Sequence, residues 1–158
     1  MKQVPSVLFV CLGNICRSPL AEAAFRKAAS DAGLDAVADS AGTASYHVGS
    51  APDPRSITTA ARYGIDILDY QGRQISAKDY TRFTHIFALD AANLSDIRRR
   101  APANTTAEIA LLLDVVEGRE GQAVVDPYHG NQDDFETTWA DVSAAAEALV
   151  VRLLSDRD

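Results

Sequence analysis

Cys11, Arg17 and Ser18 have the types and the spacing of a site that binds phosphate and attacks it. The segment from Cys11 to Pro19 reads CLGNICRSP, with five residues between the cysteine and the arginine. A segment of this length can curl into a ring whose backbone N–H groups point inward and bind an anion. The Arg17 guanidinium can bind two phosphate oxygens at once. The residues expected to form this phosphate-binding loop are Leu12, Gly13, Asn14, Ile15, Cys16 and Arg17.

The loop also favours the thiolate form of Cys11. Inward N–H groups, a helix N-terminus and an arginine each stabilise negative charge on sulfur, and Ser18 can donate a hydrogen bond to it. A thiolate beneath a phosphate group bound in this loop can attack phosphorus, so we expect a cysteinyl-phosphate intermediate. Gly13 and Asn14 tolerate the left-handed backbone of such a curl. Ser18 and Pro19 predict the N-cap and first turn of the next helix. The alternative for Cys11 is a buried structural cysteine.

A displaced alkoxide or phenolate needs a proton from a general acid. The candidate is Asp126, in the sequence DPYHG, where Pro127 restricts the backbone and Gly130 frees it. Taken by itself, this segment fits an ordinary turn without chemistry better than a catalytic loop. The presence of the cysteine loop in the same chain reverses that preference.

These residues need a scaffold, and the chain alternates apolar strands with helices. The predicted strands are Val4–Val10, Val37–Ser40 and His85–Leu89; the predicted helices follow Leu20 as far as Gly33, then Arg55–Tyr63, Ala91–Arg100 and a closing helix with an apolar stripe from Phe135 to Leu153. Residues 108–113 fit either element. The alternation predicts an open parallel α/β sheet with helices on both faces. Ligands bind such sheets beyond the carboxyl ends of the strands, which is where Cys11 falls.

Composition narrows the function further. The chain has 158 residues, so we expect a single domain over residues 1–158. A net charge of −7 argues against a nucleic-acid partner, and the basic run Arg98–Arg100 fits a solvated helix end. Two cysteines make no disulfide framework, which predicts a cytoplasmic protein. Apolar runs are too short for a signal peptide or a membrane span, although export without a signal peptide stays open. No ligand spacing predicts a metal, and no cofactor is expected; His47 and His85 are interpreted as structural.

Taken together, these motifs resemble the low-molecular-weight protein tyrosine phosphatases. The resemblance runs in order along nearly the whole chain, through the cysteine loop, DSAGT (residues 39–43), PDPR (52–55), RQI (73–75) and DPY (126–128). It implies a three-layer α/β/α fold with a four-stranded parallel sheet and a phosphate-binding loop after the first strand. The roles it implies are Cys11 as nucleophile, Arg17 as phosphate clamp and transition-state stabiliser, Asp126 as general acid and then base, and Asn14, Ser18 and Ser40 as loop supports.

The resemblance also implies an aryl-phosphate pocket. Its expected walls are Leu12, Ile15, Tyr46 and Tyr128, with His129 at the rim. For the two tyrosines, surface packing is the alternative. Similar phosphatases that act on phosphoarginine carry Thr at the position of Ile15, so Ile15 favours phosphotyrosine. Two positions depart from the family pattern: Tyr70 stands where a histidine is common, and His129 where a second tyrosine is usual.

Several alternatives to a tyrosine phosphatase remain open. An arsenate reductase of the same fold needs two further cysteines, and this chain has only Cys11 and Cys16. A phosphoarginine phosphatase, a non-catalytic phosphate-binding module and a thiol redox sensor complete the set. Cys16 is either a small core residue or a resolving thiol for oxidised Cys11. Expected partners are phosphotyrosine proteins, with a cognate tyrosine kinase as a candidate; no membrane is expected, and the chain is expected to be a monomer or weak dimer.

Overall fold

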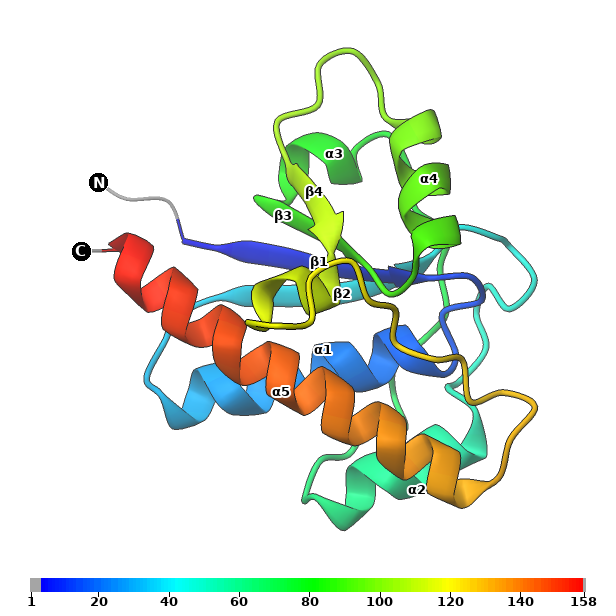
Figure 1. Ribbon diagram of the computed structural model, residues 1–158. Coiled ribbons are helices and arrows are strands. Elements are labelled where there is room, and N and C mark those ends of the chain that lie inside the picture. The colour runs from blue at the N-terminus through cyan, green and yellow to red at the C-terminus, as the bar shows by residue number, and fades with distance from the viewer. Residues whose placement is uncertain (1–3, 158) are drawn as a thin grey trace.

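A parallel sheet forms the centre of the protein in the computed structural model, which describes residues 4–157 (Figure 1). Its strands are β1 (Ser6–Cys11), β2 (Val37–Gly42), β3 (His85–Ala88) and β4 (Glu108–Leu111), in the order β2-β1-β3-β4. All three pairings are parallel, so the carboxyl ends of the strands share one edge. The chain leaves β1 toward β2 on one side and later returns to β3 on the other. The loop after β1 therefore lies at the point where the strand order reverses, which is the usual ligand site of such sheets.

Helices cover both faces of the sheet. Figure 1 shows α1 (Arg17–Asp31) and α5 (Gln132–Arg157) on one face, with α3 (Asp79–Arg82) and α4 (Ala91–Arg100) on the other. The remaining helices are α2 (Pro54–Arg62), which packs against α5, and the short 3₁₀ helix η1 (Leu112–Val115). This arrangement confirms the predicted three-layer α/β/α fold with a four-stranded parallel sheet.

The core explains why the first strand reads as a nearly continuous apolar run. Val7 and Phe9 point into the cluster under α1 and α5, and Leu8 and Val10 into the cluster under α3 and α4. A strand covered on both faces needs apolar residues at every position. Burial of each large side chain stabilises the fold by about 1.5–3 kcal/mol, and the Phe9 ring packs at a tilt against that of Phe25 on α1, with 5.7 Å between the ring centres. This packing fixes β1 and α1 on either side of the loop that joins them.

Element boundaries differ from the predicted ones in informative ways. Helix α1 begins at Arg17 with Cys16 as its N-cap residue, so the N-cap predicted at Ser18 is wrong. The Ser18 hydroxyl is instead engaged by Cys11 and Asn14. Residues 108–113, which fitted either element, divide between β4 and η1. The four-residue helix α3 is too short for periodicity to reveal.

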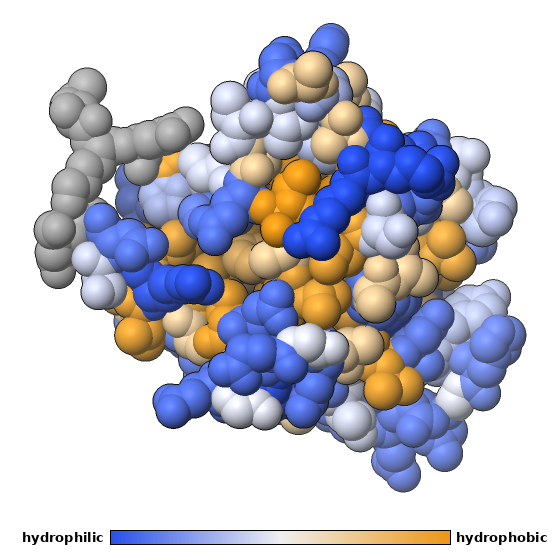
Figure 2. All heavy atoms as spheres, turned by 45° about the horizontal axis from the view of Figure 1, so that its top comes forward, coloured by the Kyte–Doolittle hydropathy of each residue, from blue (hydrophilic) through white to orange (hydrophobic). Residues whose placement is uncertain are grey.

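One face of the molecule exposes both hydrophobic and hydrophilic side chains. Figure 2 shows hydrophobic side chains gathered in a band across the middle of this face, with hydrophilic side chains around them. Within the part of the chain that the structure describes, none of the helices combines the length and the apolarity needed to cross a membrane.

Candidate active site

The loop between β1 and α1 is held in shape by Asn14. Its backbone has a φ of 59°, and it is the one non-glycine residue among 4–157 with a positive φ. The Asn14 side chain donates to the Ser18 hydroxyl at 2.8 Å, and its backbone N–H donates to the Cys11 sulfur at 3.3 Å. The Ser18 oxygen lies 3.0 Å from the same sulfur. Because this oxygen already accepts from Asn14, its own hydrogen is free to point at the sulfur. Two donors thus converge on Cys11, which is the arrangement that stabilises a thiolate.

The start of α1 adds a positive field to this loop. Helix α1 begins at Arg17, and its N-cap residue makes no side-chain cap. The first backbone N–H groups of the helix are therefore available to an anion in the loop. No acidic residue occupies the first turn to neutralise them.

Arg17 is buried, and its guanidinium is fixed on one side. Nη1 donates to Asp90 Oδ2 at 2.8 Å and to the carbonyl oxygen of Val124 at 2.9 Å. Nη2 lies 3.9 Å from Asp126 Oδ2. The rigid placement of the fork prepares it for phosphate oxygens without a large loss of side-chain entropy on binding. Asp90 was not predicted from the sequence, although it follows β3 at the carboxyl edge of the sheet, where ligands of such folds bind.

Asp126 lies at the entrance to the same cavity. Its side chain is half exposed, and Oδ1 accepts a hydrogen bond from the Tyr128 backbone N–H at 3.1 Å. Cys11, Arg17 and Asp126, which are distant in sequence, all line one cavity of about 260 Å³. The structure thus brings together the three residues that the sequence singled out for chemistry.

Aromatic and apolar side chains form the cavity walls. The predicted wall residues Leu12, Ile15, Tyr46, Tyr128 and His129 all line it. His47, which we interpreted as structural, lines it too. A Cβ atom added to Gly13 would lie only 3.0 Å from His47 Cδ2, which shows how closely the imidazole packs on the loop. The position of His47, next to Tyr46, was the available sequence signal. Apolar walls around a few polar groups suit a flat aryl phosphate.

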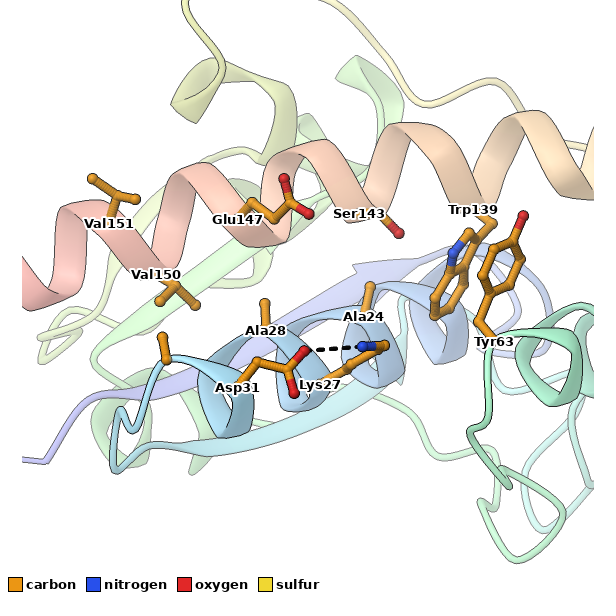
Figure 3. Close-up of a pocket in the computed structure, with 11 residues that line it drawn as sticks. Ala24, Lys27, Ala28, Asp31, Tyr63, Trp139, Ser143, Glu147, Val150 and Val151 are labelled. Atoms are coloured by element: carbon orange, nitrogen blue, oxygen red, sulfur yellow. Dashed lines mark hydrogen bonds and ion pairs between the residues drawn. The ribbon is translucent and has the colours of Figure 1, made fainter.

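A larger cavity of about 500 Å³ lies elsewhere, between α1 and α5 (Figure 3). Figure 3 shows Ala24 and Ala28 on α1 facing Val150 of α5, with Trp139 and Tyr63 at one end. It contains neither cysteine and none of the residues around the phosphate-binding loop. The smaller cavity, which holds the nucleophile, is therefore the candidate active site.

Ser40 does not support the loop in the predicted way. Its hydroxyl donates to Glu22 Oε1 at 2.8 Å, which joins β2 to the middle of α1. Burial raises the pKa of Glu22, and hydrogen bonds from Ser40 and Arg26 oppose that rise. Burial likewise raises the pKa of Tyr70, to about 12, with Glu22 the next contributor. Tyr70, which stands where the resemblance implies a histidine, therefore stays protonated at neutral pH beside this buried cluster.

Arg73 supports the loop instead. Its backbone N–H donates to Asn14 Oδ1 at 3.0 Å. Its guanidinium binds both carboxylate oxygens of Asp79 and one oxygen of Asp39. The RQI motif was recognised in the sequence, but this role was not, because it depends on a contact between segments far apart in the chain.

Cys16 is buried at the base of the same cavity. Burial raises the pKa of its thiol, and the negative charges of Asp53, Cys11 and Asp126 raise it further. Cys16 is therefore a protonated thiol at neutral pH, and a poor nucleophile by itself. Among residues 4–157, no three His, Cys, Asp or Glu side chains are grouped as a metal site requires.

Comparison with known proteins places this geometry in context. Residues 6–158 match the family model described as low molecular weight phosphotyrosine protein phosphatase. The protein of that name from Schizosaccharomyces pombe is 43% identical over 132 residues, 82% of this chain and 84% of the relative. The crystal structure of YfkJ from Bacillus subtilis has a TM-score of 0.91 and 38% identity, and covers 99% of both chains. A Drosophila arginine phosphatase has a TM-score of 0.89 at 33% identity, over 95% of this chain and 98% of that one.

Proposed function

The chain belongs to the low molecular weight phosphotyrosine protein phosphatase family, and we propose that Cys11, Arg17 and Asp126 carry out its hydrolytic reaction. The observation that carries this proposal is the shared cavity. There the Cys11 sulfur, with two hydrogen-bond donors on it, lies in one space with a fixed guanidinium and a half-exposed carboxyl group. The catalytic unit is a single domain.

In the first step, the Cys11 thiolate attacks phosphorus. The new S–P bond forms as the P–O bond to the leaving group breaks, and Asp126 gives its proton to the departing oxygen. Arg17 and the inward N–H groups of the loop bind the phosphoryl oxygens, and their fixed positions stabilise the charge of the transition state.

In the second step, water replaces the sulfur. Asp126, now ionised, takes a proton from the attacking water, and the S–P bond breaks to release inorganic phosphate and the thiolate. Neither step needs a metal, because amide groups and Arg17 meet the charge on phosphorus. A chelator should leave the rate unchanged, whereas vanadate and phosphate should compete with substrate.

The favoured substrate is phosphotyrosine in proteins. Tyr46 and Tyr128 both line the cavity that holds the phosphate-binding loop, and their rings offer apolar contacts to a phenyl group. The similarity to an arginine phosphatase keeps phosphoarginine as the second candidate, and Ile15 in the loop argues against it. The two are separated by kcat/KM on matched phosphotyrosine and phosphoarginine peptides, before and after Ile15→Thr. We expect the wild type to prefer phosphotyrosine and the variant to lose part of that preference.

Other reactions fit less well. An arsenate reductase would need cysteines that the chain lacks. A thiol sensor that only forms a Cys11–Cys16 disulfide would not turn over an aryl phosphate in reducing buffer, and a phosphate-binding module would not either. The proposed partners of the enzyme are its substrates, the phosphotyrosine proteins, and the tyrosine kinase that phosphorylates them. The site is complete within one chain, so a monomer or weak dimer suffices.

The decisive experiment substitutes the nucleophile. Cys11→Ser should lower aryl-phosphate hydrolysis by several orders of magnitude and still bind inorganic phosphate, because the loop amides and Arg17 are untouched. Turnover comparable to wild type would refute the covalent mechanism. The same variant should retain phosphotyrosine proteins from a lysate, and free phosphate should release them.

A further inference from the structure

The segment that carries Asp126 has few supports of its own. Residues 126–130 lie outside every helix and strand, and the Asp126 side chain is half exposed. Within the segment, the Asp126 carboxylate accepts from the Tyr128 N–H, and the Gly130 N–H donates to the carbonyl of Pro127. These bonds shape the turn but do not set its distance from the phosphate-binding loop. A general acid must sit within hydrogen-bond reach of the leaving oxygen, so something else has to fix that distance.

Arg55, in the first turn of α2, makes this connection. Its Nη2 donates to the carbonyl oxygen of Tyr128 at 2.8 Å, and its Nη1 donates to that of Gly130 at 2.9 Å. The guanidinium carbon also lies 4.5 Å from the ring centre of Phe135, in the first turns of α5. Helices α2 and α5 pack together at this end (Figure 1). One arginine thus holds both the acid-bearing segment and the start of the helix that follows it.

The other side of Arg55 is fixed to the phosphate-binding loop through Asp53. Arg55 Nε and Nη2 donate to the two oxygens of Asp53 at 3.1 and 3.0 Å. Asp53 in turn donates its backbone N–H to the carbonyl oxygen of Ile15 at 2.8 Å. Nearby, the Ser56 hydroxyl donates to the carbonyl oxygen of Cys16 at 3.3 Å. The start of α2 therefore binds the phosphate-binding loop on one side and the segment that carries Asp126 on the other.

We propose that Arg55 is a positioning residue that sets the distance of the Asp126 carboxyl from the phosphate bound over Cys11. This proposal rests on the role of Asp126 as general acid. The planar fork of arginine bonds Asp53 and two carbonyl oxygens at once, whereas a lysine ammonium cannot match that geometry. Burial alone would raise the pKa of Asp53, but the bonds and charge of Arg55 bring it below its ordinary value. The Asp53 carboxylate therefore stays ionised, and paired with Arg55, to a lower pH than an ordinary aspartate would.

The test measures how the rate depends on the leaving group. Arg55→Lys is compared with wild type in single-turnover formation of the cysteinyl phosphate, using phenyl phosphate and a highly activated dinitrophenyl phosphate. The poor leaving group needs the proton and the activated one hardly does. We expect a loss of about 10–100-fold for phenyl phosphate and less than about threefold for the activated ester. The Kd for vanadate should stay within about twofold of wild type, because the phosphate-binding loop keeps its own donors.

Arg62→Lys is the matched control. Arg62 lies in the last turn of the same helix and pairs with Glu136 of α5 rather than with a carbonyl oxygen of the acid segment. It should leave both rates unchanged. Asp53→Asn is a second variant, since asparagine still caps α2 but loses the charge that fixes Arg55. It should show the same leaving-group pattern in weaker form, and it decides the matter if Arg55→Lys fails to fold.

A double variant separates the two proposals. In an Asp126→Asn background, Arg55→Lys should add little further loss for phenyl phosphate, because the acid it positions is gone. An equal loss for every leaving group in Arg55→Lys, or full additivity with Asp126→Asn, would overturn the positioning role while leaving the acid assignment intact. An Asp126→Asn variant without leaving-group dependence would overturn both.

Discussion

Asn14 should be the loop residue whose replacement most sharply separates backbone strain from lost hydrogen bonds. Its φ of 59° lies in the left-handed region, which asparagine tolerates, glycine adopts freely and alanine resists. Its side chain joins the Arg73 backbone N–H to the Ser18 hydroxyl, at 3.0 and 2.8 Å. Asn14→Gly removes the bonds without adding strain, and Asn14→Ala removes the same bonds and adds the strain.

The magnitudes follow from these contacts. Leaving the partly buried Arg73 N–H unsatisfied costs about 1–3 kcal/mol, and the bond to Ser18 contributes about 0.5–1.5 kcal/mol. Asn14→Gly should therefore lower the free energy of unfolding by about 2–4 kcal/mol. Alanine adds about 1–2 kcal/mol of left-handed strain and regains about 0.4–1 kcal/mol through the lower entropy of its unfolded chain. Asn14→Ala should thus be less stable than Asn14→Gly by about 0.5–1 kcal/mol.

Urea unfolding at equilibrium measures both differences, with phosphate inhibition as a report on the loop. Asn104 provides the control, because it is an exposed turn residue with a negative φ. There Ala should be at least as stable as Gly, since only the entropy of the unfolded chain differs. If Asn14→Gly proves as unstable as Asn14→Ala, or less stable, the strain argument is wrong. If both variants keep wild-type phosphate affinity, Asn14 does not shape the loop.

Three further expectations follow. Gly42→Ala should raise the inhibition constant for phosphate and destabilise the fold by about 1–3 kcal/mol. The reason is that the added Cβ would lie 2.6 Å from a carbonyl oxygen of the phosphate-binding loop. An unchanged inhibition constant would contradict the expected distortion of that loop. Burial lowers the pKa of His85 below 6.5, so as pH falls the unfolded chain binds a proton at this histidine before the folded chain does. The free energy of unfolding should therefore decrease as the pH drops from about 6.5 through the lowered pKa. Urea titrations of His85→Gln should lack that part of the decrease. Cys16→Ser should keep most activity in reductant but recover poorly after peroxide treatment, and full recovery would remove its protective role toward Cys11.

The fold could be predicted where burial requires a regular spacing of apolar residues in the sequence. β1 is covered on both faces, and α1 and α5 each bury a stripe of apolar side chains, so the spacing of their apolar residues predicts these elements. The short helix α3 and the change from β4 to η1 have no such pattern, because four residues complete about one turn. The N-cap of α1 was misplaced for a different reason. Ser18 is a good capping residue by type, but here its hydroxyl serves a cysteine across the loop.

The site was predictable to the extent that its chemistry is local. Cys11 and Arg17 are fixed by a spacing within one loop, and Asp126 could be chosen only because the same chain also carries that loop. Arg73 and Asp90 act through contacts with residues roughly 60 to 70 positions away along the chain. Neither periodicity nor composition reports such pairs, so only the folded chain reveals them.

Arg17 has a structural task as well as a chemical one. The Val124 backbone N–H donates to the carbonyl of Leu89, which extends the end of β3, and Val124 in turn accepts from Arg17. Arg17 therefore ties α1 to the chain that leads, two residues later, into Asp126. Removal of its guanidinium would leave Arg55 as the remaining tie between the acid segment and the phosphate-binding loop, at the same time as it removes the clamp. A large loss of activity on substitution of Arg17 thus reports both effects together. The leaving-group dependence of the remaining rate is what separates them, because it responds to the position of the acid and not to the clamp.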